Sequence, residues 1–126
     1  HGDAHAWNFL YPKNPGRPVY LIDWQCWELG LGARDTAYLI GLCWKQSLRR
    51  QHEYALLRRY YDGLLAHGIT GYSWEDCWYD YRLMCLYNVY FPACFYHKRF
   101  GEKAMWRIID HSIQTVLAHD CLALLS

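Results

Sequence analysis

The sequence has few of the features that mark membrane proteins and nucleic-acid binders. It has no apolar run near the roughly 20 residues that a membrane span needs, and the longest candidate, residues 83–96, is interrupted by Asn88 and Pro92. Neither sign of charge is in excess, because 13 Lys and Arg stand against 12 Asp and Glu, for a formal net charge of +1. A general nucleic-acid or membrane-surface binder needs a basic excess. We therefore expect neither a nucleic acid nor a membrane as partner.

Cysteine pairs at the spacing of zinc ribbons and thioredoxin sites are also missing. No two of the six cysteines form a C-x-x-C motif. Their wide spacing in an aromatic-rich context favours buried free thiols over three disulfides, which is typical of a reducing compartment. We therefore predict a cytoplasmic protein whose thiols fill the core, at positions Cys26, Cys43, Cys77, Cys85, Cys94 and Cys121.

The chain does have enough apolar material for one folded domain. Its 126 residues correspond to about one domain. Hydrophobic residues make up 53% of the sequence and charged residues 20%, which excludes a disordered chain. We predict a single domain over residues 1–126, in which residues 1–31 hold the polar motifs and a hairpin and residues 32–126 form a helical subdomain.

Turn residues and apolar periodicity predict one small β-hairpin followed by about four helices. Residues 9–11 and 19–22 flank a proline-rich turn and are expected to pair as strands. The fold class is therefore mainly α, with an α+β character that comes from the hairpin. Helices are predicted from Arg34 to about Trp44, over residues 50–67, over residues 74–98 with a kink or break at Pro92, and over residues 101–124.

Local signals give these helices expected ends and faces. Gly68 is expected to end the second helix, and Ser73 with Asp76 to form a capping box at the start of the third. Arg49-Arg50 and Arg58-Arg59 are interpreted as solvated helix faces. The first helix should bury Ala37, Ile40, Gly41 and Trp44, and the second Tyr54, Leu57, Tyr61, Leu64 and Leu65.

Two short segments carry the polar side chains typical of a phosphoryl-transfer site. Residues 1–8 form the string H-G-D-x-x-x-x-N, in which Asp3 and Asn8 have the spacing of the protein-kinase catalytic loop. Asp23 follows the second predicted strand, where that template has a metal-binding aspartate. Hairpin pairing would bring Asn8 and Asp23 to one edge, and carboxylate and amide oxygens are ligands that magnesium prefers. The two segments therefore predict three oxygen ligands that converge on one site.

These motifs closely resemble those of the aminoglycoside phosphotransferase and choline kinase family, including its ecdysteroid kinase-like branch. The resemblance is carried by residues 1–8, by Leu21-Ile22-Asp23-Trp24 and by residues 32–38. It implies a protein-kinase-like C-terminal lobe, with a catalytic loop and a small β-hairpin followed by about four helices. It also implies ATP as phosphoryl donor, Mg²⁺ as cofactor and the hydroxyl of a small molecule as acceptor.

The resemblance further implies roles for five side chains. Asp3 would be the catalytic aspartate that faces the acceptor hydroxyl, and Asn8 and Asp23 would hold magnesium on the ATP phosphates. His1 would support the catalytic loop, and Asp35 would brace that loop through backbone hydrogen bonds. His5 falls at a variable position of the family and receives no role.

The family's N-terminal lobe has no counterpart in the sequence. No glycine-rich phosphate loop, strand lysine or adenine hinge precedes the H-G-D string. We therefore expect the chain to be the C-terminal lobe of a longer protein. It should work with an N-terminal lobe of that same protein and be inactive alone.

Two other functions are compatible with the residues. A non-catalytic, pseudokinase-like interaction module would keep the fold and lose turnover, although the joint presence of Asp3, Asn8 and Asp23 argues against decay. A zinc-dependent hydrolase would use His1, Asp3 and His5 as metal ligands. Further ligands near strand ends are then needed, and the remaining histidines all fall in predicted helices.

Aromatic and acidic residues supply candidates for the acceptor site. The chain has seven Trp and twelve Tyr, most of which are expected in the helical core. Aromatic faces and carboxylates bind cationic groups such as a choline-like ammonium. Aminoglycoside, amine, sugar and sterol alcohols all fit the sequence as acceptors. The acceptor-site candidates are Trp24, Trp27, Glu28, Asp76 and Asp80.

Overall fold

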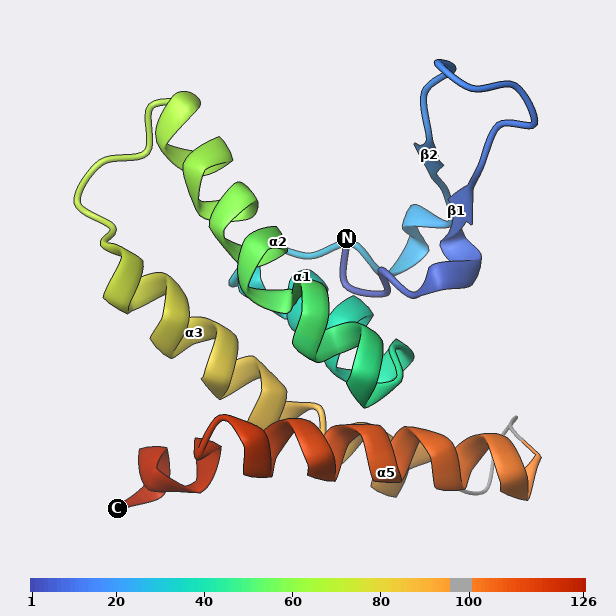
Figure 1. The fold of residues 1–126 in the computed structure, drawn as a ribbon, viewed down its shortest axis with the longest axis vertical. Helices are drawn as coiled ribbons and strands as arrows, with labels where there is room; N and C mark the ends of the chain where they lie inside the picture. Colours follow the sequence, from blue (N-terminus) through green and yellow to red (C-terminus); the bar gives the residue numbers. More distant parts are fainter. Residues whose placement is uncertain (96–100) are drawn as a thin grey trace.

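A small β-hairpin projects from one side of a body of helices (Figure 1). The computed structural model describes residues 1–95 and 101–126, and 66% of the structure is helical. The hairpin and the helix α5 lie at opposite sides of the molecule, with α1, α2 and α3 between them. The predicted mainly-α class with one hairpin is confirmed.

The hairpin pairs strand β1 (Phe9–Leu10) with strand β2 (Tyr20–Leu21) in antiparallel register, with Phe9 opposite Leu21. A 3-10 helix, η1 (Ala6–Asn8), leads into β1, and a second one, η2 (Trp24–Cys26), follows β2. The strands are shorter than predicted because Pro12 and Pro18 stand just beyond them, and proline has no N–H to donate to a ladder.

The first predicted helix is two elements, α1 (Ala33–Ala37) and a π-helix, η3 (Tyr38–Leu42). The predicted buried face is confirmed at Ala37, Ile40 and Gly41. Because α1 packs mainly on α3 and η3 on α5, this segment joins the hairpin side of the molecule to the far helices.

Helix α2 (Gln46–Ala66) begins four residues before the predicted start. Its buried side chains are Arg49, Glu53, Leu57 and Tyr61, which repeat every fourth residue. The predicted inner stripe is wrong at Tyr54 and Leu65, which are 62% and 43% exposed.

The solvated face predicted for Arg49 is wrong as well, since that side chain is fully buried in an ion pair with Glu53. The prediction of Gly68 as the residue that ends the helix is confirmed, with φ +85°.

Helix α3 (Trp74–Tyr87) starts at the predicted capping box, in which the Ser73 hydroxyl accepts from the Asp76 N–H and the Asp76 carboxylate accepts from the Ser73 N–H. The predicted break is found, because α4 (Tyr90–Phe95) is a separate helix. The proline ring of Pro92 excludes a continuous helix through Asn88, its i−4 residue. Residues 96–98 of the predicted helix lie outside the described residues.

Helix α5 (Glu102–Ala118) lies across α3 and is followed by a 3-10 helix, η4 (Cys121–Leu125). The prediction of one helix to residue 124 is wrong at Asp120, whose left-handed backbone, with φ +48°, ends the helix. The core lies where α1, α2, α3 and α5 meet. Its buried members are Ala37, Leu57, Tyr61, Cys77, Tyr81, Cys85, Val116 and Cys121.

All six cysteines are free thiols, as predicted. Cys77, Cys85 and Cys121 are buried, and burial raises the pKa of each of these thiols. The prediction that every thiol is core filler is wrong for Cys26 and Cys94, which are exposed. Within the described part of the chain, no helix is long and apolar enough to cross a membrane.

Candidate active site

Residues 1–8, which we call the H-G-D loop, close into a tight turn around the carbonyl oxygen of Asp3. This oxygen accepts hydrogen bonds from the backbone N–H of His5 (2.9 Å) and from Nδ2 of Asn8 (2.8 Å). The Asn8 N–H donates in turn to the His5 carbonyl (3.0 Å). The Asn8 side chain is buried, whereas the Asp3 side chain keeps 29% of its surface exposed. The loop therefore holds Asn8 inside and presents the Asp3 carboxylate.

Helix α1 places Asp35 against the start of this loop. Its Oδ2 accepts from the backbone nitrogen of His1 (2.7 Å), and its Oδ1 accepts from the Gly2 N–H (2.9 Å). Each carboxylate oxygen thus holds one backbone nitrogen. Hydrogen bonds to a carboxylate are stronger than those between neutral groups, so Asp35 fixes the loop to the helical body immediately before Asp3.

The imidazole of His1 links the H-G-D loop to strand β2. Its Nδ1 accepts from the Asp3 N–H (3.2 Å), so the proton of the neutral ring is on Nε2, which donates to the Ile22 carbonyl (3.0 Å). The ring also packs edge-on against Trp24, with 4.7 Å between the ring centroids. His1 therefore ties the segment that carries Asp3 to the segment that carries Asp23.

A zinc site made of His1, Asp3 and His5 does not form. Both ring nitrogens of His1 are engaged in hydrogen bonds within the chain and offer no lone pair to a metal. Among residues 1–95 and 101–126, no three His, Cys, Asp or Glu side chains are arranged to hold a metal ion. The geometry argues against the zinc hydrolase that these three residues suggested.

Asn8 and Asp23 come to the same edge of the hairpin. The Ile22 N–H donates to the Asn8 carbonyl (2.9 Å), which extends the register of the strands by one pair. Asp23 is the next residue, exposed and in the left-handed region (φ +67°), which aspartate enters more readily than most residues. Since Nδ2 of Asn8 is held by Asp3, its carbonyl oxygen Oδ1 is the atom that can ligate a cation.

Two further side chains face the Asp3 carboxylate. Nε2 of His5 lies 3.6 Å from Oδ2 of Asp3. Burial raises the pKa of the Tyr38 phenol, and the charge of Asp3 and a hydrogen bond with Asp3 raise it further. Nothing in the sequence pattern singled out Tyr38, because it reaches Asp3 from the π-helix η3, a local distortion that apolar periodicity does not predict.

The acceptor-site candidates fall into two groups. Trp24, Trp27 and Glu28 are exposed and follow Asp23 directly along the chain; the Trp24 indole donates to the Leu21 carbonyl (2.9 Å), and Glu28 pairs with Arg34. Asp76 and Asp80 lie on α3 and have local partners instead. The carboxylate of Asp76 completes the capping box, and that of Asp80 accepts from the Tyr72 hydroxyl (2.8 Å).

Comparison with known proteins identifies the family of this site. The model of the ecdysteroid kinase-like family matches residues 1–69, which is more than half of the chain and includes the H-G-D loop, the hairpin and helices α1 and α2. A search of the curated proteins and a search of the solved structures each return no match. Because this family is kinase-like, the match supports phosphotransferase chemistry but does not identify the acceptor. The chain belongs to the ecdysteroid kinase-like family.

Proposed function

We propose that this chain is the acceptor- and metal-binding half of a small-molecule kinase, which transfers the γ-phosphoryl group of ATP to a hydroxyl. One observation supports the proposal. Asp3 and Asn8 share one hydrogen-bonded loop, and the hairpin pairs Asn8 with Ile22, the residue before Asp23. The side chains of His1 and Asp35 fix these two segments to each other and to α1. Phosphoryl transfer needs such preorganisation, because the protein catalyses it almost entirely by positioning the reacting groups and stabilising their charge.

In this proposal Asp3 receives the proton of the acceptor hydroxyl. The acceptor oxygen forms a bond to the γ-phosphorus, the bond from that phosphorus to the β,γ-bridging oxygen breaks, and the hydroxyl proton moves to the carboxylate. ADP leaves with the bridging oxygen. Asp3 suits this task because it stays partly exposed while the backbone on both sides of it is fixed.

The donor set of Asn8 and Asp23 fits magnesium. Both offer only oxygen atoms, and magnesium usually keeps several waters and takes one or two protein ligands beside substrate phosphates. When bound there, the ion would neutralise charge on the phosphate oxygens. Asn8 is suited to hold it because its amide is oriented by the hydrogen bond from Nδ2 to the Asp3 carbonyl.

We further propose that an N-terminal lobe of the same polypeptide covers this site and supplies the nucleotide pocket. The residues around the site leave large apolar surfaces in water: Trp7 is 78% exposed, Trp27 65% and Leu29 95%. Exposed apolar surface on this scale is typical of an interaction face.

The test is transfer of labelled γ-phosphate from Mg·ATP to a panel of amine-bearing, sugar and sterol alcohols. It uses a polypeptide in which residues 1–126 follow a complete N-terminal lobe. Asp3→Asn should lower kcat by about 10²- to 10⁴-fold and leave the KM for ATP nearly unchanged, since the interaction with Asp3 matures in the transition state.

The matched control is Asp110→Asn, which changes an exposed aspartate on α5, across the molecule from the hairpin. It should keep the kcat of the unchanged protein. Equal turnover by the Asp3 and Asp110 variants would remove Asp3 from the mechanism, and no transfer by the unchanged protein to any alcohol would refute the proposed activity.

A further inference from the structure

His5 is the polar side chain of the H-G-D loop to which the proposed function gives no task. Its Nε2 lies 3.6 Å from Oδ2 of Asp3, slightly beyond hydrogen-bond distance. The backbone keeps it there, because the His5 N–H donates to the Asp3 carbonyl and the His5 carbonyl accepts from the Asn8 N–H. The turn that buries Asn8 is therefore the same turn that sets His5 against the catalytic carboxylate.

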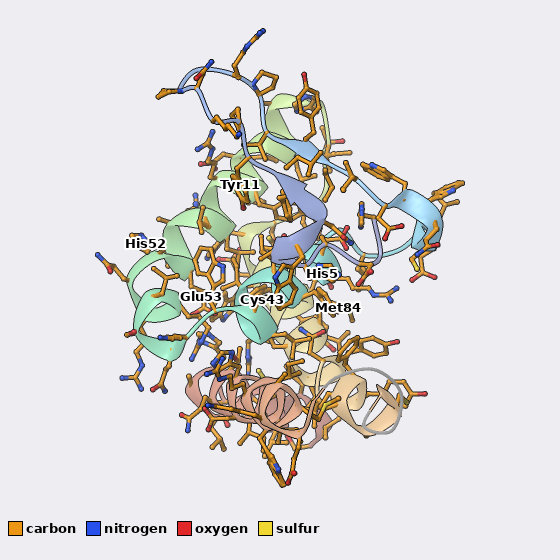
Figure 2. All side chains as sticks on the ribbon, turned by 90° about the vertical axis from the view of Figure 1, so that its right-hand side faces the viewer. His5, Tyr11, Cys43, His52, Glu53 and Met84 are labelled. Carbon is orange, nitrogen blue, oxygen red and sulfur yellow. The ribbon has the colours of Figure 1, made fainter. Side chains whose placement is uncertain are left out.

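Two aromatic rings lie next to the His5 imidazole. Trp7 packs edge-on against it, with 5.6 Å between centroids, and the Tyr38 ring lies tilted to it with 6.4 Å between centroids. Tyr38 is itself held by an edge-on contact with Phe91 of α4, at 5.4 Å. Figure 2 shows His5 between the hairpin and the far helix α5, in the region where Cys43 is also labelled. The His5 imidazole thus lies among aromatic rings, beside the Asp3 carboxylate.

The burial of Nδ1 selects one tautomer of this ring. Nδ1 of His5 is shielded from solvent and has no hydrogen-bond partner among the described residues. A proton on Nδ1 would bury an unpaired N–H donor, which proteins avoid more strongly than an unpaired acceptor. It would also turn the Nε2 lone pair toward a carboxylate oxygen. The neutral ring therefore carries its proton on Nε2, directed at Oδ2 of Asp3.

We propose that His5 is a positioning residue for Asp3: its Nε2–H holds Oδ2, so that Oδ1 is the oxygen that receives the acceptor's proton. Nδ2 of Asn8 also donates to Oδ2 of Asp3, over 3.5 Å. Two donors from one loop thus lie close to Oδ2. The Tyr38 hydroxyl also hydrogen-bonds this carboxylate, whose remaining lone pairs serve the substrate. The 3.6 Å separation shortens to a hydrogen bond when substrates bind, as catalytic hydrogen bonds often do. This inference rests on the proposed function of Asp3.

The kinetic test compares three substitutions of His5 in the two-lobe polypeptide. Glutamine can place an N–H near the position of Nε2, asparagine places one near Nδ1, and phenylalanine keeps a ring without a donor. His5→Gln should keep most of kcat, whereas His5→Asn and His5→Phe should lose on the order of 10- to 100-fold, the loss typical of removing a group that orients a functional side chain. The KM values for ATP and for the acceptor should change little.

A second readout needs no activity. In the 126-residue chain, ¹⁵N chemical shifts of the His5 ring should show the Nε2–H tautomer at neutral pH, and Asp3→Ala should weaken this preference. The Nδ1–H tautomer would overturn the inference, as would full activity of His5→Phe or equal losses in all three variants. If the unchanged protein transfers no phosphate, the proposed function fails, and the tautomer data for the unchanged chain and Asp3→Ala still decide whether the His5 N–H is directed at Asp3.

Discussion

Gly2 stands where the H-G-D loop passes the backbone of η2. Its φ is +84°, a backbone conformation that residues with a side chain rarely adopt. A Cβ added there would lie only 2.3 Å from the carbonyl oxygen of Cys26. Glycine is therefore required twice, once by the backbone angle and once by the close approach. The consequence is that the segments carrying Asp3 and Asp23 pack directly against each other.

Substitution of Gly2 by alanine should separate these two requirements. Gly16 has the same φ of +84° with no atom within 4 Å of an added Cβ, so Gly16→Ala measures the backbone strain alone. We expect Gly16→Ala to lower the free energy of unfolding by about 1 to 2 kcal/mol. Gly2→Ala should cost clearly more, because a backbone carbonyl must move. Urea unfolding measures both values, and equal losses would show that the contact with Cys26 contributes nothing.

At this scale the sequence predicts the identities of the polar residues better than their contacts. The spacing of Asp3, Asn8 and Asp23 is local, and hairpin pairing follows from two short strands and a proline-rich turn. The approach of Tyr38 to Asp3 depends on a π-helix, far from Asp3 in the chain, whereas the approach of His5 depends on the local turn of the H-G-D loop. No local pattern encodes the contact of Tyr38.

At the scale of whole elements, a buried polar cluster joins α2 to α3 and α5. Oε2 of Glu53 lies 2.9 Å from NH1 of Arg49 and 2.9 Å from Nε2 of His119, and Oε1 accepts from the Tyr81 hydroxyl (2.5 Å). Arg49 also donates to the Gln114 carbonyl (3.4 Å). The Glu53 carboxylate therefore joins α2 to α3 and to His119, the residue that follows α5.

Removal of that carboxylate should be among the most destabilising single changes in the chain. Glu53→Ala leaves the Arg49 guanidinium, 1% exposed, without its counter-charge. Breaking one side of a buried pair costs about 3 to 5 kcal/mol. The control is Asp62→Ala, which removes an exposed partner 3.9 Å from Arg58 and should cost no more than about 0.5 kcal/mol. Similar losses for the two variants in urea unfolding would contradict the role of Glu53.

The same cluster predicts a dependence of stability on pH. Burial raises the pKa of Glu53, but hydrogen bonds from His119 and Tyr81, with the charges of His119 and Arg49, outweigh it and leave this pKa below its ordinary value. The unfolded chain therefore binds a proton at Glu53 more readily than the folded chain does. This contribution to stability is present above the unfolded pKa and is lost as pH falls through the folded one.

Glu53→Gln cannot titrate, so it isolates this contribution. Between about pH 5 and about pH 3, the unfolding free energy of the unchanged chain should fall more steeply than that of Glu53→Gln. Denaturant unfolding at a series of pH values gives both curves. Parallel curves over this range would show that Glu53 titrates alike in the folded and unfolded chain.

This cluster also explains where prediction of the helices failed. The capping box of α3 and the glycine that ends α2 were predictable, since each depends on a few neighbouring residues. The buried stripe of α2 was not, because Arg49 and Glu53 look like solvent-facing residues until α3 and α5 supply Tyr81 and His119. A charged side chain can be buried only with such partners, and these lie 28 or more residues away.

At the scale of the whole molecule, the segment that carries the candidate active site exposes a series of large apolar side chains. Large side chains from the loop and hairpin segment are exposed there, although α5 also leaves Trp106 and Leu117 exposed. A monomeric protein rarely leaves a large apolar patch in water. We call this set the site-side residues: Trp7, Leu10, Tyr11, Tyr20, Trp24, Trp27 and Leu29.

The 126-residue chain alone should therefore bind Mg·ATP weakly and self-associate. In the proposed function it supplies the metal ligands and the acceptor-side carboxylate, and without a second lobe water screens these charges and leaves the phosphates unpositioned. We expect a Kd no tighter than about 1 mM by calorimetric titration, no transfer to alcohols, and concentration-dependent association in sedimentation velocity. Leu29→Ser should weaken that association, whereas Leu117→Ser, at a 63% exposed position on α5, should not. Micromolar binding of Mg·ATP by a monomeric chain would show that residues 1–126 form a complete nucleotide site.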